Sequence, residues 1–214
     1  MNMTRHIRAA CHEVRRFRSD QSGAGLVEYS LVILLFLFLL FAIIDFGRLA
    51  NAWVAANKAT QIAARLAAVR PPVCPGVPTQ NVRGTATGST TFGSMCRLGT
   101  GVCADPGTFT CQGNDTNATS VEILQAIRPL MPPGTQADNL RFSYSFDPDL
   151  GFLGGPYIPM VTVEFINVDF VFISQLGRML TPLTGNTTAL GADIPMPGMS
   201  VSLPGEDLAQ GMDG

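Results

Sequence analysis

The sequence predicts an α+β protein: a single N-terminal transmembrane helix, extended as a long α-helical spine, followed by a small disulfide-bearing domain with an antiparallel sheet. Three observations predict it. An unbroken apolar run lies near the N-terminus, four cysteines cluster further along, and two later stretches alternate apolar and polar residues. Only 14% of the 214 residues are charged, well below the roughly 25% of soluble domains. A net charge of −2 gives no reason to expect a nucleic-acid partner.

The apolar run extends without interruption from Leu31 to Ile44. Extended back to Leu26, it approaches the roughly 20 residues that cross a bilayer as a helix, and Glu28 is its single charge. The apolar side chains outweigh the few kcal/mol that one carboxylate costs at this depth. A buried helix of a soluble protein is the alternative, but such a helix would carry a polar face. The run therefore predicts a membrane span.

Arginines are concentrated before this span. Residues 1–23 hold five arginines, whereas residues 45–64 hold only Arg48 and Lys58 as basic residues. Positive residues favour the cytoplasmic side, which places the N-terminus inside and the rest of the chain outside. A nucleic-acid-binding arm is the alternative for the cluster, and the adjoining apolar run disfavours it.

The cysteines agree with this orientation. Cys11 lies on the predicted inside, and the other four lie on the predicted outside: Cys74, Cys96, Cys103 and Cys111. An even number of cysteines in an oxidising compartment predicts two disulfides, with three possible pairings. A zinc site is the alternative, but the chain has no C-x2-C pair and no histidine after His12.

The residues just before the apolar run form a recognisable order. Several arginines precede Gly23, and Ala24, Glu28 and Tyr29 follow it before the run begins. This order resembles a class IV prepilin cleavage site, in which a prepilin peptidase cuts after the glycine on the cytoplasmic face. The resemblance makes Gly23–Ala24 the cleaved bond, and Glu28 and Tyr29 the residues used for subunit assembly.

A physical argument supports a carboxylate at this position. Cleavage would expose a new ammonium group on Ala24, and that group needs a partner when subunits pack away from water. Glu28, four residues on, can supply one within its own chain or to a neighbour, since a buried unpaired charge costs several kcal/mol. The alternative is that Glu28 simply lies solvated at the level of the lipid headgroups.

The resemblance extends through the run. Val27-Glu28-Tyr29, Leu31-Val32 and the exit Asp45-Phe46-Gly47-Arg48 resemble the signature of the TadE-like minor pilin or pseudopilin family of the tight-adherence pilus. Where that family often carries a proline early in the run, this chain has Ile33-Leu34. The similarity covers about residues 15–50.

The resemblance implies a function and a division of the chain. It implies a minor pilin or pseudopilin needed to assemble a tight-adherence type IV pilus, supporting surface adhesion and biofilm formation. A minor subunit is implied because the major pilin of such pili is much shorter than this chain. Residues 1–23 would be a cleaved cytoplasmic leader, 24–45 the transmembrane helix, 46–70 its extracytoplasmic continuation and 71–214 an extracytoplasmic α+β domain with a loop-rich tail. The protein would be single-pass in the bacterial inner membrane, with its C-terminal domain periplasmic or extracellular.

The implied partners are the membrane, the prepilin peptidase, the pilus platform proteins, the major pilin and other minor pilins. No cofactor, metal, nucleic acid or small-molecule substrate is expected, and no enzymatic activity. His6 and His12 are the only histidines and both lie in the leader, which removes histidine-based catalysis from the exterior. Asp147 and Asp149 flank a proline and are typical of a turn, and Asn114–Asn117 of a polar loop rather than a calcium site.

Two alternatives remain open at this point. Ala50-Asn51-Ala52 fits an ordinary secretory cleavage site, which would leave an exported binding module or enzyme beginning near Trp53. The chain could also be a membrane-anchored domain that is never cleaved and is unrelated to pili.

The helix is expected to continue outside the membrane until Pro71-Pro72 stops it. A seam of residues at helical spacing supports this continuation: Leu49, Trp53, Ala56, Thr60, Ala63 and Ala67. The seam would pack either on its own domain or on neighbouring subunits.

The remaining residues predict a small sheet. Residues 73–118 are expected to be loops, and Thr119 to Glu122 resemble a capping box that opens a helix to Arg128. Alternation predicts strands at 140–146 and 161–165, the latter extended through 167–174, and a weaker strand at 199–203. Residues 147–159 read as a loop, and the tail from Thr181 as loosely ordered.

Overall fold

The computed structural model describes residues 23–86, 88, 90–172, 194–206 and 208. The chain divides into two compact units, of which the first reaches Gly47 and the second begins at Arg48. Helix α2 (Ala24–Val69) runs through this boundary without a break, as predicted. The leader, Cys11 and both histidines lie outside the described residues.

The first part of α2, up to Gly47, is covered with exposed apolar side chains. Its leucines, isoleucines and phenylalanines are largely exposed, and none of its most apolar 18-residue window is buried. Among the described residues, α2 is long and apolar enough to cross a membrane. Water is an unfavourable neighbour for this surface, so lipid or other apolar helices are expected to cover it.

The second part of α2 packs on its own domain. Ala56, Ala63 and Ala67 of the predicted seam are buried, and Thr60 donates a hydrogen bond from its hydroxyl to the Ala56 carbonyl at 2.8 Å. Trp53, also in the seam, has 51% of its surface exposed. Among the residues of α2, the buried core cluster begins at Ala56.

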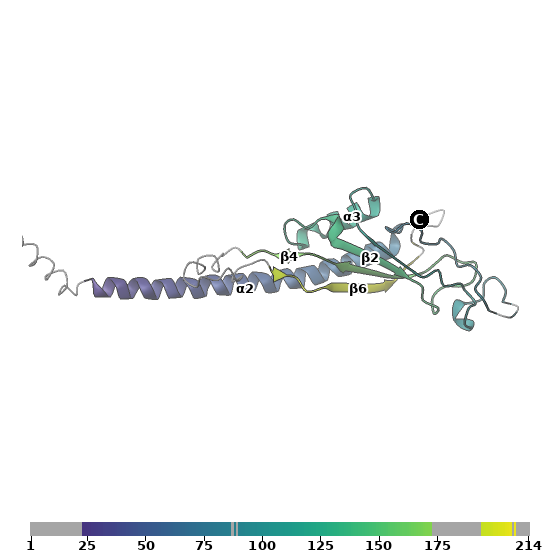
Figure 1. Ribbon diagram of the computed structural model, residues 1–214, viewed down its shortest axis with the longest axis horizontal. Helices are drawn as coiled ribbons and strands as arrows, with labels where there is room; N and C mark the ends of the chain where they lie inside the picture. Colours follow the sequence, from purple (N-terminus) through teal and green to yellow (C-terminus); the bar gives the residue numbers. More distant parts are fainter. Residues whose placement is uncertain (1–22, 87, 89, 173–193, 207, 209–214) are drawn as a thin grey trace, which may run out of the picture. The chain divides into compact units, whose positions relative to one another are not determined.

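Four antiparallel strands form the sheet in the order β1-β2-β3-β6 (Figure 1). The predicted strands are confirmed as β2 (Leu140–Ser145), β3 (Met160–Phe165) and β6 (Met199–Pro204). In β2 and β3, buried residues alternate with half-buried ones, as one-sided packing requires. β1 (Thr108–Gln112) was not predicted, because it lies within the cysteine-bearing segment that reads as loop.

The core lies between the sheet and the second part of α2. The alanines of the helix contact the inner side chains of β2 and β3 and the apolar face of α3 (Ala118–Ile127): Phe142, Tyr144, Val161, Val163, Ile123 and Ile127. Alanine on the helix lets the sheet approach closely while the large residues of the strands fill the space. The alanines of the seam therefore pack on their own domain, whereas Trp53 stays exposed.

The predicted extension of β3 is wrong in its described part. β3 ends at Phe165, and Asn167 adopts a left-handed backbone conformation with φ of 54°, which breaks the strand. β4 (Asp169–Phe170) then pairs with β5 (Ile194–Pro195) in a separate two-stranded sheet. Residues 173 and 174 lie outside the described residues.

Helix α3 begins earlier than predicted. Its N-cap is Asn117, whose side-chain oxygen accepts a hydrogen bond from the Ser120 amide at 3.0 Å, so the capping box at Thr119 is wrong. Glu122 instead forms an ion pair with Arg70, just after the end of α2. The helix ends at Ile127 and continues as a short 3₁₀ turn, η2 (Arg128–Leu130). Two further 3₁₀ turns are η1 (Cys96–Leu98) and η3 (Ala137–Asn139).

Two disulfides form, and the pairing left open by the sequence is Cys74–Cys111 and Cys96–Cys103. The first joins the segment after α2 to β1 and lies in the main core. The second lies in a smaller cluster with Val102 and Leu153. The predicted α+β fold class is thus confirmed, with a long apolar N-terminal helix, an antiparallel sheet and two disulfides.

The expectation of a loosely ordered tail from Thr181 is wrong where the chain is described. β5 and β6 belong to the two sheets, and Leu208 is fully buried in the main core. β6 is held because its apolar residues pair with β3 and cover the edge of the core. Residues 181–193 lie outside the described residues.

Candidate assembly site on helix α2

Gly23 lies at the start of α2. Its carbonyl accepts hydrogen bonds from the amides of Leu26 and Val27, both at 3.2 Å, so the chain becomes helical at Ala24. Nothing described lies within 4 Å of the position that a Cβ at Gly23 would occupy. The Gly23–Ala24 bond therefore lies at the start of the helix.

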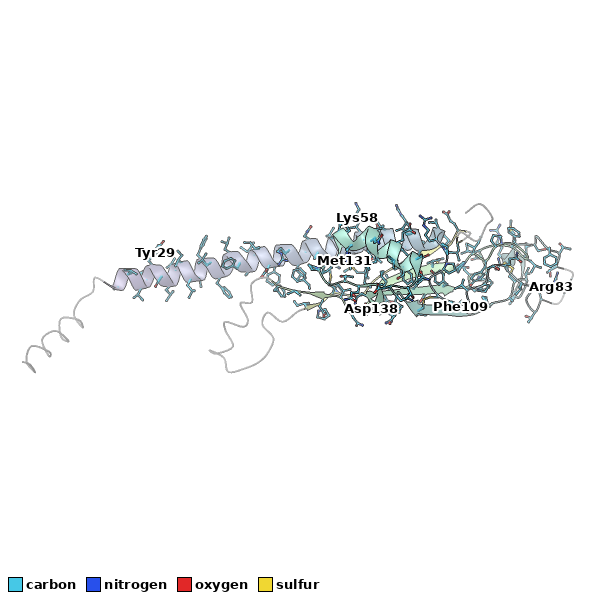
Figure 2. The ribbon with its side chains drawn as sticks, turned by 90° about the horizontal axis from the view of Figure 1, so that it is seen from above. Tyr29, Lys58, Arg83, Phe109, Met131 and Asp138 are labelled. Atoms are coloured by element: carbon cyan, nitrogen blue, oxygen red, sulfur yellow. A yellow bond between two sulfur atoms is a disulfide. The ribbon has the colours of Figure 1, made fainter. Side chains whose placement is uncertain are left out.

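Ala24 and Glu28 are four residues apart on the same helix, and side chains at this spacing share one face. Glu28 is exposed, and within the described residues its carboxylate forms no hydrogen bond or ion pair. Tyr29, labelled in Figure 2, is also exposed. Ser30 by contrast donates its hydroxyl to the Val27 carbonyl of its own helix at 2.8 Å. The predicted assembly residues are thus presented outward.

The end of the apolar part carries a different kind of contact. Asp45 is buried, with 4% of its surface exposed. The Arg48 guanidinium lies 5.5 Å from the ring centroid of Phe170 in β4, a cation–π contact. Phe170 in turn makes an edge-to-face contact with Phe172 at 5.3 Å. The sequence identified Asp45 and Arg48 only as part of the TadE-like signature. Nothing local in the sequence connects Arg48 with Phe170, which lies far along the chain.

The outer domain also contains a hollow lined by charged side chains. This hollow of about 890 Å³ lies beside the Cys96–Cys103 disulfide and is lined by both signs of charge, from Arg83, Arg97, Asp105 and Asp149. No group of three metal-ligating side chains occurs among the described residues.

The polar motifs of the domain serve its turns. Asp147 accepts a hydrogen bond from the Asp149 amide at 2.9 Å, as expected for a turn-forming aspartate. Asn114 accepts from the amides of Thr116 and Asn117, at 3.0 and 2.8 Å, and so closes a polar loop ahead of α3.

A family model described as TadE-like protein matches residues 23–65 of the chain. The predicted resemblance to the TadE-like family is confirmed over this segment, which begins at Gly23 and reaches into the part of α2 that packs on the sheet. This family is structural and related to pili, so the similarity indicates a pilin-like protein associated with the tight-adherence pilus. The chain matches no curated protein and no solved structure.

Proposed function

We propose that the chain is a minor pilin or pseudopilin that takes part in assembling a tight-adherence type IV pilus, and so supports surface adhesion and biofilm formation. In this proposal a prepilin peptidase cuts after Gly23 and residues 24–45 hold the subunit in the inner membrane. The N-terminus faces the cytoplasm, and the domain from residue 71 lies outside. The protein acts as a structural subunit rather than an enzyme.

One observation carries the proposal. The family match begins at Gly23, immediately before a helix whose first half exposes apolar side chains on all sides. A helix made only to anchor a domain needs the apolar surface but no carboxylate. Yet Glu28 is the one charged residue between Ala24 and Ile44, and it stands one helical turn after the proposed new N-terminus.

The pairing of Glu28 with an ammonium group explains this placement. After cleavage, the Ala24 ammonium and the Glu28 carboxylate lie on one face of α2. The carboxylate can pair with the ammonium of its own subunit or with that of a neighbouring subunit. Withdrawing both from water together costs less than withdrawing either alone, since the opposite charge compensates part of the lost hydration. Glu28 therefore favours packing only of the processed chain, which ties cleavage to assembly.

The N-terminal sequence and intact mass of the protein from membranes, with and without the prepilin peptidase, test this proposal. We expect a chain that starts at Ala24 only when the peptidase is present. A start near Trp53 or an uncut chain would contradict it. The first of these outcomes would also require cleavage inside α2, which is continuous across Ala52.

Two carboxylate-to-amide variants separate cleavage from assembly. Glu28→Gln should still be cut but should be depleted from sheared pilus fractions or should lower the yield of pili. Glu122→Gln, a matched change in the outer domain, should be cut and should leave both its amount in sheared pilus fractions and the yield of pili unchanged. If Glu28→Gln assembles as well as the unaltered chain, the proposed ammonium partner is wrong.

A further inference from the structure

The outward side of the second part of α2 carries an organised row of side chains. Residues spaced three and four apart share one helix face. We call this row the outer stripe: Val54, Lys58, Gln61, Arg65 and Val69. All five are exposed, with 66% of the surface of Val54 open, and they lie away from the alanines that contact the sheet. The row therefore presents two cations, Lys58 and Arg65, to the surroundings of the helix.

The cations of the outer stripe have no counter-charge nearby. Lys58 and Arg65 form no ion pair with any described residue, whereas Arg70, beyond the stripe, is held by Glu122 at 2.7 Å. The sequence between Phe46 and Ala104 contains no aspartate or glutamate. The stripe is therefore a positive surface within a wholly non-acidic segment.

The acidic residues gather in the rest of the chain. Of its 16 acidic residues, 12 follow residue 104, against 3 of its 14 basic residues. Asp138 and Asp169 are exposed and unpaired within the described residues. Asn139 joins their two segments, because its side-chain amide donates to the carbonyls of Ile166 and Asn167 at 3.2 and 3.0 Å. Figure 2 shows Lys58 and Asp138 on opposite sides of the domain.

We propose that the outer stripe of one copy docks on the acidic surface around Asp138 and Asp169 of a second copy of this chain. Opposite charges on opposite sides of one domain make two copies complementary in a head-to-tail contact. Such a contact leaves a stripe free at one end and an acidic surface free at the other, so it repeats along a row of subunits. This inference deepens the proposed function by naming the second copy as a partner, and rests on it.

The chain supplies its own reporters for this contact. Lys58 is its only lysine and belongs to the outer stripe, and Trp53, its only tryptophan, lies earlier on the same helix. A zero-length carbodiimide reagent joins an amine to a carboxylate in direct contact. Apart from the N-terminal amine, only Lys58 can therefore report a carboxylate partner.

Mixed full-length chains, one unlabelled and one ¹⁵N-labelled, would be treated with carbodiimide in detergent micelles. We expect cross-linked peptides of mixed isotope composition that join Lys58 to Asp138 or Asp169. Lys58→Arg should abolish this cross-link and keep the self-association, which is followed by sedimentation and by Trp53 emission. Absence of mixed-isotope products at Lys58 would overturn the proposal.

Charge reversal gives the sharper test. Lys58→Glu/Arg65→Glu and Asp138→Lys/Asp169→Lys should each weaken self-association at least about tenfold at low salt, and mixing the two variants should restore it, since each then carries the complement of the other. Two variants that associate normally, or a mixture that stays dissociated, would contradict the contact. Protection of Lys58 from the cross-linking reaction by anionic lipid vesicles, without a second copy of the chain, would also contradict the contact. Processing at Gly23 should be unchanged in both variants, so failure here is distinguishable from failure of the proposed function.

Discussion

The two halves of α2 are one continuous helix built for different surroundings. Between Ala24 and Gly47 the large side chains are exposed all around the helix, as at Leu35 with 59% of its surface open. Between Arg48 and Val69 the apolar face is mostly alanine and is buried against the sheet. The first half has the apolar bulk that a lipid environment requires, and the second has the small side chains that close packing requires.

This difference separates anchoring from folding. Changes in the second half should alter the stability of the outer domain, whereas changes of similar size in the first half should leave it unaltered. The first half contributes only to insertion and to contacts with other helices. The predictions below test this separation, beginning with the largest effect.

Removing the disulfide that follows α2 should lower the free energy of unfolding more than any other change considered below. Replacing both Cys74 and Cys111 with serine opens a loop with a sequence separation of 37, against 7 for Cys96 and Cys103. Chain-entropy arguments give a loss of about 4 kcal/mol for the longer loop and about 2 kcal/mol for the shorter. Chemical denaturation of the two double variants measures the difference, and equal losses would contradict it.

A larger side chain in the seam should lower the free energy of unfolding by somewhat less than loss of this disulfide does. Ala63→Leu forces extra methylene groups between helix and sheet, and should lower the free energy of unfolding by about 1–3 kcal/mol. Ala50→Leu, at an exposed position of the same helix, and Leu35→Ala, in the apolar half, should each change it by less than about 0.5 kcal/mol. If Leu35→Ala destabilises the domain as much as Ala63→Leu does, the two halves are not separate in the way described.

Tyr144 should make the domain sensitive to alkali. Burial raises the pKa of Tyr144 to about 12, although a hydrogen bond from the Val73 amide to its hydroxyl oxygen partly lowers it. The unfolded chain loses this proton near pH 10, so the native state binds more protons between pH 10 and 12. The free energy of unfolding should therefore be fully maintained below pH 10 and should fall as the pH rises toward 12.

Tyr144→Phe isolates this contribution. The variant should lose about 1–2 kcal/mol at pH 8, because the Val73 amide loses its acceptor. Its free energy of unfolding should also decline less steeply between pH 10 and 12. Part of the remaining decline should come from Tyr157, because burial and the nearby Asp105 raise the pKa of Tyr157 to about 12. Denaturation curves in a Cys11→Ser background, which avoids thiol exchange, provide the measurement. An unchanged slope would show that Tyr144 does not titrate in this range.

The ion pair near the end of α2 should matter least. Arg70 and Glu122 lie 2.7 Å apart, but both side chains are nearly half exposed. Exposed pairs contribute about 0–1 kcal/mol because water screens them. Glu122→Gln should therefore lower the free energy of unfolding by less than about 1 kcal/mol, and the loss should shrink in high salt. A larger, salt-independent loss would indicate a packing role for Glu122.

Much of this architecture follows from local patterns. The long helix, the strands β2, β3 and β6 and the existence of two disulfides were predicted, because each depends on residues close together in sequence or on cysteine number and compartment. Pro71-Pro72 predicted the end of α2 for the same reason. The candidate site at Gly23 and Glu28 came from a short motif, and its predicted role is a proposal.

Features that depend on distant partners were not predictable. β1 is a strand because it pairs with β2 and its Cys111 is joined to Cys74, and neither fact is local. The turn at Asn167 ends β3 although the following residues suit a strand. Trp53 fits the periodicity of the seam, yet it is exposed whereas the alanines of the seam are buried. Only the tertiary structure decides how much of a periodic face is buried.

The most direct test of the central claim is the accessibility of two positions on α2 in intact membranes. Single cysteines would replace Phe38, within the apolar half, and Asn57, on the exposed side of the second half, in a Cys11→Ser background. A membrane-impermeant maleimide added from the periplasmic side should label position 57 at once. Position 38 should react only after the membrane is dissolved. Labelling of position 38 in intact membranes, or of position 57 only from the cytoplasmic side, would contradict the account.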